Sequence, residues 1–180
     1  MTQGKMSHPN LLPASARVAT PWKNGGGRTW EIAAYPPGSG LDDFGWRIST
    51  AEVEAAGPFS TFPQIDRILT VLEGRLELRR DDDGESILLE VGQSHAFPGD
   101  VAIVGRPIVG PVRDLNVMVR RGAWTAAVST SRPPQMPGTT VIAVASQSGG
   151  GLDALDAVRL MDGAVLPGDF TGYFISLRCI

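Results

Sequence analysis

The stretch RILTVLEGRLELRRDDDGESILLE, residues 67–90, decides the fold class of this chain. It contains three short apolar runs, separated by the turn signals Glu73-Gly74 and Asp81-Asp82-Asp83-Gly84. In the middle run Leu76 and Leu78 alternate with charged residues, which is the period of a strand with one buried face. Strands joined by glycine-containing turns form β-hairpins, so we expect an antiparallel meander over this stretch.

Strand-like runs continue on both sides of this stretch. Further strands are expected at residues 29–34, 46–53, 101–104, 114–120, 125–130, 139–145 and 173–178. Glycine (22) and proline (14) are frequent, which favours turns over long helices. The one helical candidate is 152–161, and a single helical turn is an equal alternative there because the segment is short. Many short strands separated by turns are typical of an all-β sandwich or barrel with little helix.

Length and composition indicate a globular chain whose partners are neither nucleic acids nor membranes. The 180 residues suffice for one domain or for two small halves packed as one. The formal net charge of −3 provides no basic surface for phosphates. No run approaches the roughly 18 to 20 apolar residues that a membrane-spanning helix needs. We therefore expect a soluble protein, in which residues 1–13 form a loose tail because they lack periodicity.

Cysteine usage and the N-terminal segment indicate a cytoplasmic location. Cys179 is the only cysteine and cannot form an intrachain disulfide, so the fold does not need an oxidising compartment. The Ala14-Ser15-Ala16 sequence imitates a signal-peptide cleavage site. Only Leu11 and Leu12 precede it, however, where an apolar core of about seven residues or more is needed. We expect no export signal.

Two histidines limit the metal and nucleophile chemistry. His8 lies in the expected tail and His95 precedes Phe97, whereas a catalytic metal site usually takes three protein ligands. We expect no metal and no other cofactor. No serine lies in a Gly-x-Ser-x-Gly elbow, so a serine nucleophile is not indicated. A carboxylate with a pKa shifted by burial, such as Asp66 or Glu31, stays open as a general acid or base.

The run WKNGGGRTWEI, residues 22–32, places three consecutive glycines between an aromatic residue and a strand. Glycine reaches positive φ values and lets a ligand or another backbone come close. Phosphate binding is not indicated, because the pattern Gly-x-x-x-x-Gly-Lys is missing and the glycines precede a strand instead of a helix. The run is therefore either a corner of the fold or the wall of a binding site.

Arginines near strand ends offer the most promising binding chemistry. Arg47 and Ser49 share one face of their strand, and Trp46 lies on the other. Arg67 follows Asp66 at the start of the expected meander. The planar guanidinium fork suits a carboxylate ligand. For each arginine alone, a solvated side chain or a structural ion pair is the alternative.

Taken together, these segments resemble the HutD/Ves family of bacterial proteins. The matching segments are Trp22-Lys23-Asn24-Gly25-Gly26-Gly27 with Thr29 and Glu31-Ile32; Phe44-Gly45-Trp46-Arg47-Ile48-Ser49 with Ala51 and Val53; Gly57-Pro58-Phe59-Ser60 and Phe62; Asp66-Arg67, Leu72 and Gly74; Phe97-Pro98-Gly99-Asp100; and Asp114-Leu115-Asn116-Val117-Met118. They span residues 22–121. Gln64 stands where the family pattern predicts a glycine, and Arg75 stands where the family often has a small residue. Both departures affect the expected turn geometry and not the resemblance.

The resemblance implies a cupin-type antiparallel β-barrel or sandwich with two cupin-like halves in one chain, a bicupin, over residues 14–121 and 122–180. It also implies a role in bacterial histidine utilisation, as a non-catalytic ligand-binding or regulatory component. Urocanate and N-formylglutamate, both small carboxylates, are the candidate ligands. The His-x-His, Glu and His set of metal-binding cupins is missing from the chain.

We therefore expect a cytoplasmic protein that binds a small anionic metabolite in its N-terminal barrel. The expected ligand-binding residues comprise two arginines for the carboxylates, polar contacts and aromatic walls: Arg47, Arg67, Asn24, Gly25, Gly26, Ser49, Asp66, Asn116, Trp22, Trp46 and Phe97. Two other functions stay open: a metal-free cupin isomerase or hydrolase with a carboxylate base, and a protein interaction module marked by exposed apolar surface. A two-fold homodimer is expected on base rates alone.

Overall fold

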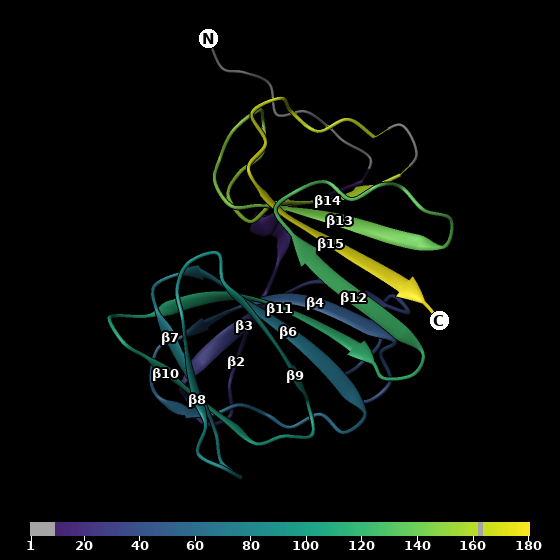
Figure 1. Cartoon of the computed structure of the whole chain (residues 1–180). Coiled ribbons are helices and arrows are strands. Elements are labelled where there is room, and N and C mark those ends of the chain that lie inside the picture. Colours follow the sequence, from purple (N-terminus) through teal and green to yellow (C-terminus); the bar gives the residue numbers. More distant parts are fainter. Residues whose placement is uncertain (1–9, 162–163) are drawn as a thin grey trace. The chain divides into compact units, whose positions relative to one another are not determined.

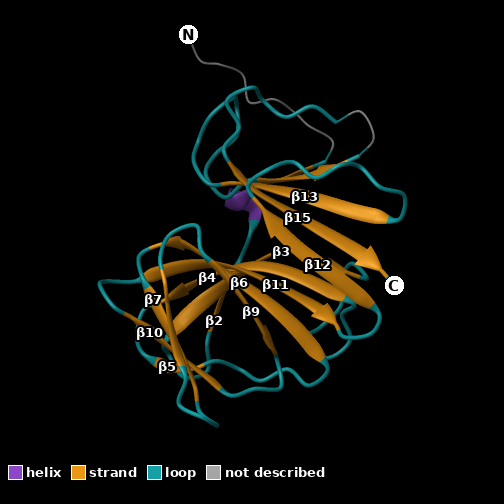
Figure 2. Ribbon diagram, viewed as in Figure 1, coloured by secondary structure: helices purple, strands orange, loops and turns teal. Residues whose placement is uncertain are grey.

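The computed structural model describes residues 10–161 and 164–180, and these residues form an all-β structure. Strands account for nearly all regular structure (Figure 2), and within the described ranges the only helix is the 3₁₀ turn η1 (Ala14–Ala16). The chain divides into two compact units. One comprises Val18–Trp124, and the other combines the segment that ends at Arg17 with Thr125–Ile180.

The unit 18–124 is a jelly roll of two antiparallel sheets. The six-stranded sheet has the order β2 (Ala19–Pro21), β3 (Gly27–Tyr35), β4 (Trp46–Val53), β11 (Val112–Arg120), β6 (Ile65–Glu73) and β9 (Ser94–Pro98). The four-stranded sheet has the order β5 (Gly57–Pro58), β10 (Ile103–Pro107), β7 (Leu76–Arg80) and β8 (Ser86–Leu89). Strands β4 to β11 thus pass back and forth between the sheets in the order of an eight-stranded jelly roll, the architecture of the cupins (Figure 1).

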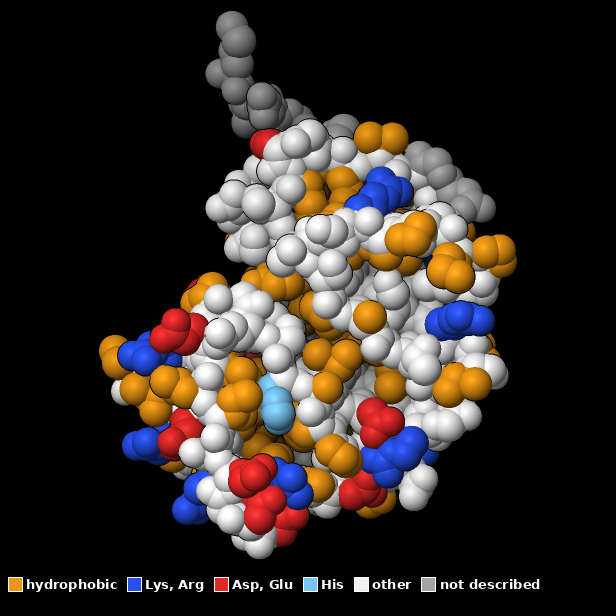
Figure 3. All heavy atoms as spheres, viewed as in Figure 1, with side chains coloured by type: hydrophobic (Ala, Val, Ile, Leu, Met, Phe, Trp, Pro, Cys, Tyr) orange, Lys and Arg blue, Asp and Glu red, His pale blue; other side chains and the backbone are white. Residues whose placement is uncertain are grey.

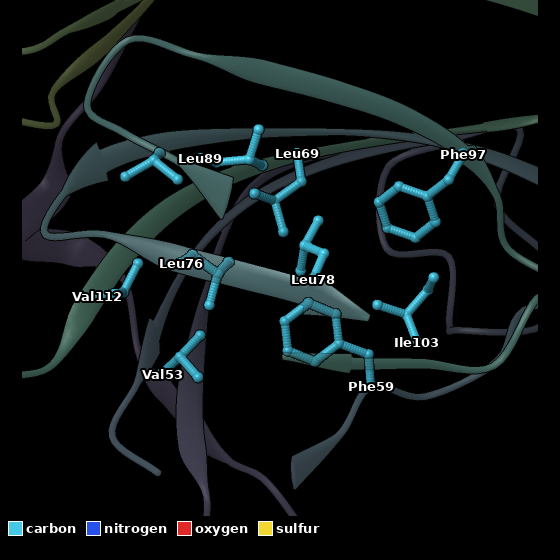
Figure 4. Close-up of a cluster of buried hydrophobic side chains, with 10 residues drawn as sticks. Val53, Phe59, Leu69, Leu76, Leu78, Leu89, Phe97, Ile103 and Val112 are labelled. Atoms are coloured by element: carbon cyan, nitrogen blue, oxygen red, sulfur yellow. The ribbon is translucent and has the colours of Figure 1, made fainter. Parts of the chain in front are cut away.

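The apolar core of this unit lies between its two sheets. Alternate residues of a strand point to the same face of a sheet. Val53, Leu69 and Val112 of the six-stranded sheet therefore meet Leu76 and Leu78 of the four-stranded sheet (Figure 4). All five side chains are 2% exposed or less. Since burial of one such side chain stabilises a fold by about 1.5–3 kcal/mol, this cluster determines which face of each strand points inward.

The meander expected over residues 67–90 is only partly confirmed. Strands β7 and β8 pair as a hairpin, with Leu76 opposite Leu89. Strands β6 and β7 belong to different sheets, so the expectation that they pair is wrong. Between them Gly74 has a φ of +82°, and a Cβ there would lie 3.0 Å from the carbonyl oxygen of Pro111. This tight turn takes the chain from one sheet to the other, a step that the alternation of apolar and charged residues does not reveal.

The second unit contains a five-stranded sheet. Its order is β1 (Leu11–Leu12), β14 (Ala157–Leu160), β13 (Thr139–Ala145), β15 (Gly172–Cys179) and β12 (Trp124–Ser129). The buried cluster on this sheet comes from its three central strands: Val141, Ala143, Val158, Leu160 and Phe174. Strand β13 has the bounds expected from the sequence, and β12 and β15 differ from expectation by one residue at each end.

The helical candidate at residues 152–161, for which a single helical turn was the equal alternative, does not form a helix. Ala157–Leu160 is strand β14, which pairs with β13. The side chain of Asp156 accepts hydrogen bonds from the backbone N–H groups of Ala14 and Asp153, at 2.7 and 3.0 Å, and so fixes a turn directly before the strand. Leu152, Leu155 and Val158 follow one another at a spacing of three, but the first two lie in the turn region and Val158 lies in the strand.

The N-terminal segment is partly ordered by the same strand. Residues 1–9 of the tail expected at 1–13 lie outside the described residues. Leu11 and Leu12 form β1 and pair with Val158 and Ala157 of β14. A strand of two residues has no periodicity that the sequence could display.

The strands that carry the site described below follow the sequence closely. Strand β4 has the expected bounds, 46–53. Strand β3 begins two residues before and ends one residue after its expected range, and β11 begins two residues before its own. The strand expected at 101–104 begins only at Ile103. In the described part of the chain we find no helix with the length and apolarity needed to span a membrane.

Candidate functional site

The register of the six-stranded sheet brings the polar residues of three strands to one face. Met118 of β11 lies opposite Arg47 of β4 on one side and Arg67 of β6 on the other. In the next row Asn116 lies opposite Ser49 and Leu69. Residues directly opposite each other in antiparallel strands point to the same face. Because Leu69 belongs to the core between the sheets, this face is the interior of the jelly roll.

Arg67 is buried on this face, with part of its hydrogen-bonding capacity unused. The residue is 7% exposed. One terminal nitrogen donates to the backbone oxygen of Ser60 at 3.2 Å, and the other donates to Oδ1 of Asn116 at 2.9 Å. Nε has no hydrogen-bond partner among the residues that the structure describes. A buried donor without a partner is uncommon, because leaving it unpaired costs about 1–3 kcal/mol.

Three phenylalanines surround the Arg67 guanidinium. Its central carbon lies 5.0 Å from the ring centroid of Phe97, 5.6 Å from that of Phe62 and 5.7 Å from that of Phe59. All three distances are within the range of cation–π attraction. Burial lowers the pKa of Arg67 to about 10, and the negative charge of Asp114 opposes this shift. The guanidinium therefore remains positively charged at neutral pH.

Asp114 extends this arrangement by one further hydrogen bond. The Nδ2 group of Asn116 donates to Oδ1 of Asp114, while Oδ2 has no partner among the described residues. Burial raises the pKa of Asp114 to about 7, and the charge of Arg67 and the hydrogen bond from Asn116 act in the opposite direction. Asn116 thus connects a buried cation to a buried carboxyl group that titrates near neutral pH.

Arg47 is the second arginine on the interior face, and it is ion-paired. Its Nε lies 2.8 Å from Oε2 of Glu31, and its side chain is 14% exposed. Glu31 lies opposite Ser49 on β3, so it belongs to the same face. Strand β11 separates Arg47 from Arg67, which places their backbones about 10 Å apart at a strand spacing of about 4.8 Å.

The glycine run forms a corner that leads to the phenylalanines. Asn24 Oδ1 accepts a hydrogen bond from the N–H of Gly26 at 3.0 Å, and Gly25 has a φ of +70°. Trp22 donates its Nε1–H to Thr29 Oγ1 at 2.8 Å. Its ring packs edge-on against Phe59, with the centroids 5.7 Å apart. The run therefore turns the chain into β3 and supports one of the rings beside Arg67.

The structure brings some of the expected site residues together and separates others. Arg67, Asn116 and Phe97 are in contact, and Arg47 and Ser49 share their face. Trp22 contacts Phe59, which in turn lies beside Arg67. Asn24, Gly25 and Gly26 form the turn before β3.

Asp66 and Trp46 point away from the interior face. Asp66 lies beside Arg67 in sequence and is half-exposed, at 2.8 Å from the Nε of Arg121. Trp46 is buried on the same side and stacks on Tyr35, with the centroids 6.1 Å apart. Neither side chain can contact Arg67's free donor from there, since adjacent residues of a strand face opposite sides of the sheet.

Sequence reasoning missed three residues of this cluster. Asp114 precedes Asn116 by two positions, and this spacing alone indicates that both share a face. Phe59 and Phe62 lie in the irregular segment between β5 and β6, where no periodicity marks a buried residue.

Among the described residues, neither metal ligands nor the charges on the face drawn in Figure 3 point to another site. Within residues 10–161 and 164–180 no group of three or more His, Cys, Asp and Glu side chains could hold a metal ion. A depression of about 390 Å³ lies on the outer face of β7 and β10, lined by Glu77, Arg79, Val104 and Arg106. Its arginines are exposed, and Arg106 is paired with Glu77 at 2.8 Å. On the face drawn in Figure 3, acidic and basic side chains lie next to one another instead of forming a patch of one sign.

Comparison with known proteins gives matches over most of the chain. Residues 14–150 match the family model described as HutD. The chain is 38% identical over 146 residues to an uncharacterised 21.2 kDa protein in the hutC 3′ region of Pseudomonas putida, covering 78% of this chain and 76% of that protein. It is 36% identical over 108 residues to the protein Ves of Citrobacter koseri, covering 59% of this chain and 56% of that protein.

Two solved structures are similar over nearly the whole chain. A conserved protein of unknown function from Pseudomonas aeruginosa is 30% identical, with a TM-score of 0.77 and coverage of 94% of this chain and 97% of that one. The HutD protein from Pseudomonas fluorescens is 31% identical, with a TM-score of 0.74 and coverage of 94% and 98%. The similarity thus includes both units.

Proposed function

Since the chain belongs to the HutD family, we propose that it binds a small carboxylate intermediate of histidine degradation inside its jelly roll and serves as a cytoplasmic sensor or regulatory component. The name of the P. putida relative places that protein beside hutC, which supports the link to histidine utilisation. The candidate ligands are urocanate and N-formylglutamate. The ligand and the regulatory role are both part of this proposal.

The unpaired Nε–H of buried Arg67 carries the proposal. A guanidinium has five N–H donors, and two of those on Arg67 have protein acceptors. A carboxylate has two oxygens that fit the parallel N–H groups of such a fork, in charge-assisted hydrogen bonds. Its arrival would supply both the missing acceptor and a counter-charge in a site of low dielectric constant. A charge held in the interior without all its partners is costly, and a ligand offsets that cost.

The neighbouring residues determine which carboxylate fits. Asn116 orients the guanidinium, Ser49 offers a hydroxyl on the same face, and the rings of Phe97, Phe59 and Phe62 surround the guanidinium with apolar surface. Arg47 lies about 10 Å further along the row and can exchange its Glu31 partner for a second ligand carboxylate. Two arginines on one face favour a ligand with two anionic groups, and N-formylglutamate is the candidate with two carboxylates.

A thermal-shift screen with urocanate, N-formylglutamate, histidine and glutamate tests the proposal. A ligand that binds the folded protein at 100 times its Kd stabilises it by about 2.7 kcal/mol. Arg67→Met should remove this shift while its side chain keeps apolar contact with the phenylalanines. The control is Arg113→Met on β11, whose arginine faces the opposite side and pairs with Glu52 at 3.3 Å. Unchanged melting with all four compounds at millimolar concentration would exclude the proposed ligands.

An enzyme without a metal is the second candidate, and Asp114 is the observation that favours it. The earlier candidates for a base, Glu31 and Asp66, are both ion-paired with arginines. Asp114 instead has a pKa of about 7 and a free carboxylate oxygen near Arg67, which is the profile of a general base. NMR of the bound compound during prolonged incubation distinguishes the two functions. Turnover that is lost in Asp114→Asn would establish the enzyme, and an unchanged spectrum would support the sensor.

The bicupin interpretation belongs to the same proposal. The jelly roll of unit 18–124 is the cupin-type half, and we propose the five-stranded sheet of the second unit as the other half. The match of the HutD family model extends beyond the jelly roll, to residue 150, which supports treating both units as parts of one architecture.

A further inference from the structure

Asp114 is the buried acid closest in the hydrogen-bond network to the proposed ligand site. It is 1% exposed, and two hydrogen bonds, both made by the Asn116 side chain, connect it to the Arg67 guanidinium. Its Oδ2 has no partner among the described residues, so no donor stabilises a negative charge on this oxygen and a proton can bind there. The role inferred for this acid rests on the proposed function, since it concerns the docking of a carboxylate on Arg67.

The charges of the interior do not balance once an anion has docked. In the free protein, the buried positive charge of Arg67 faces the buried carboxyl group of Asp114. A ligand carboxylate adds a second negative charge beside the same cation, and like charges that share a site of low dielectric constant raise the pKa of one of them. The ligand touches the guanidinium directly, whereas Asp114 contacts it only through Asn116. Asp114 is therefore the group that takes up the proton.

The other charged or ionisable groups on the interior face are less suited than Asp114 to take up the proton. On β3 and β4, Glu31 and Arg47 neutralise each other at 2.8 Å. On β9, His95 lies opposite Leu69 and stacks on Phe97, with the centroids 5.8 Å apart. The four-stranded sheet turns apolar side chains towards the interior: Leu76, Leu78, Leu89 and Ile103. His95 carries an imidazole that can exchange a proton, so it requires a control.

We propose that ligand binding at Arg67 is coupled to protonation of Asp114, so that the protein binds its carboxylate ligand together with one proton. The affinity for the anion then falls as the pH rises, because each bound ligand must draw a proton from solution. Asp114 acts on the ligand through Asn116 and Arg67 and not by direct contact. Its protonation state makes the site favour a ligand that places a single negative charge at Arg67. The affinity of the site for this ligand therefore depends on the cytoplasmic pH. Above the point where free Asp114 ionises, Kd should rise by up to tenfold per pH unit.

Isothermal titration calorimetry with N-formylglutamate measures the proton directly. The carboxyl groups of this probe titrate near pH 4, as carboxyl groups generally do, so they stay ionised between pH 6 and 8. Titration in two buffers with different ionisation enthalpies gives the number of protons taken up per ligand. We expect a number approaching one at pH 8 and a clearly smaller number at pH 6, together with weaker binding at pH 8.

Three variants assign the proton to a residue. Asp114→Asn should bind N-formylglutamate without proton uptake and with a Kd that does not change with pH, because the asparagine side chain mimics the protonated acid. Glu52→Gln removes a carboxylate from β4 that pairs with Arg113 on the opposite face, and His95→Gln removes the titratable group of β9. Both should retain the proton uptake of the wild type.

The outcomes separate this inference from the proposed function. Binding without proton uptake, or uptake that persists in Asp114→Asn, would overturn the coupling and leave ligand binding intact. Loss of the uptake in His95→Gln would assign the proton to His95 and refute the role of Asp114. If neither N-formylglutamate nor urocanate gives heat with the folded wild type at any pH, the proposed function fails and this inference fails with it.

Discussion

Replacement of Asp114 by asparagine tests the electrostatics of the interior in the absence of any ligand. Burial raises the pKa of Asp114 to about 7 in the folded protein, whereas the unfolded chain titrates near its ordinary value of about 4. The folded state therefore holds a proton over a range in which the unfolded state has lost it. The stability that this group contributes is complete below about pH 4 and is lost as the pH rises to about 7.

The size of the effect follows from the two pKa values. A difference of one unit between the folded and unfolded pKa corresponds to about 1.4 kcal/mol. The roughly three units between the two pKa values of Asp114 therefore lower the free energy of unfolding by about 4 kcal/mol above pH 7, relative to its value near pH 4. The attraction to Arg67 is already contained in the raised pKa. Asp114→Asn keeps the shape of the side chain and stays neutral at every pH. It should be as stable as the wild type near pH 4 and more stable by about 4 kcal/mol at pH 8.

Urea unfolding between pH 4 and 8 measures this difference. Asp100→Asn is the control, because the pKa of Asp100 is lowered by the N–H of Gln64 and by Arg121. A lowered pKa has the opposite sign: the stability from Asp100 is present above about pH 4 and is lost as the pH falls. That variant should be less stable than the wild type at neutral pH and equal to it in acid. An Asp114→Asn effect that is independent of pH, or that grows towards acid, would refute the reasoning.

Two further predictions concern packing and the glycine corner. Leu76→Ala removes a fully buried side chain of the jelly-roll core and should cost about 2–5 kcal/mol in urea unfolding, whereas Ile87→Ala, at a position 39% exposed, should cost clearly less. Gly27→Ala places a Cβ against the carbonyl oxygen of Glu52 and should lower the thermal midpoint, whereas Gly168→Ala has no heavy atom within 4 Å of the new Cβ and should not. Equal effects within either pair would contradict the packing described.

The strands of the site could be predicted because each buries one face. In β4 the alternation of Arg47 and Ser49 with Trp46 and Ile48 is visible in the sequence, and the structure keeps both pairs on opposite faces. The register between these strands could not be predicted in the same way. Met118 lies opposite Arg47 of β4 and opposite Arg67 of β6. This arrangement depends on the register of three strands, which no local pattern in the chain specifies.

The same alternation also shows where sequence reasoning about the site was inconsistent. Asp66 and Arg67 are neighbours in β6, so period two sends them to opposite faces, and they were nevertheless expected in one site. Asp114 and Asn116, two positions apart, were the pair that the period places together. Phe59 and Phe62 could not be found this way, because the segment between β5 and β6 follows no period.

Gln64 illustrates how a departure from the family pattern becomes a structural feature. A glycine was expected there, and Gln64 adopts a φ of +62°, the left-handed conformation that favours glycine. Its N–H donates to Oδ1 of Asp100 at 3.0 Å, and Arg121 contacts both Asp100 and Asp66. These contacts hold the strained residue directly before β6, three positions before Arg67.

On the interior face of the jelly roll, one row of the apolar core lies several positions from the arginines, and this distance helps to make the proposed site testable. Antiparallel pairing aligns Val53 with Val112 at one end and Arg47 with Met118 at the other. Val53 and Val112 belong to the buried cluster that stabilises the fold, while Arg67 and Asn116 lie in the rows of Met118 and Leu69. A substitution of Arg67 therefore leaves the contacts between Val53, Val112 and the four-stranded sheet unchanged. Phe59 and Phe97 of the same cluster contact Arg67 itself, and methionine keeps apolar contact with both rings. Loss of ligand binding in an Arg67→Met protein that still unfolds cooperatively then reports on the site and not on the packing of the two sheets.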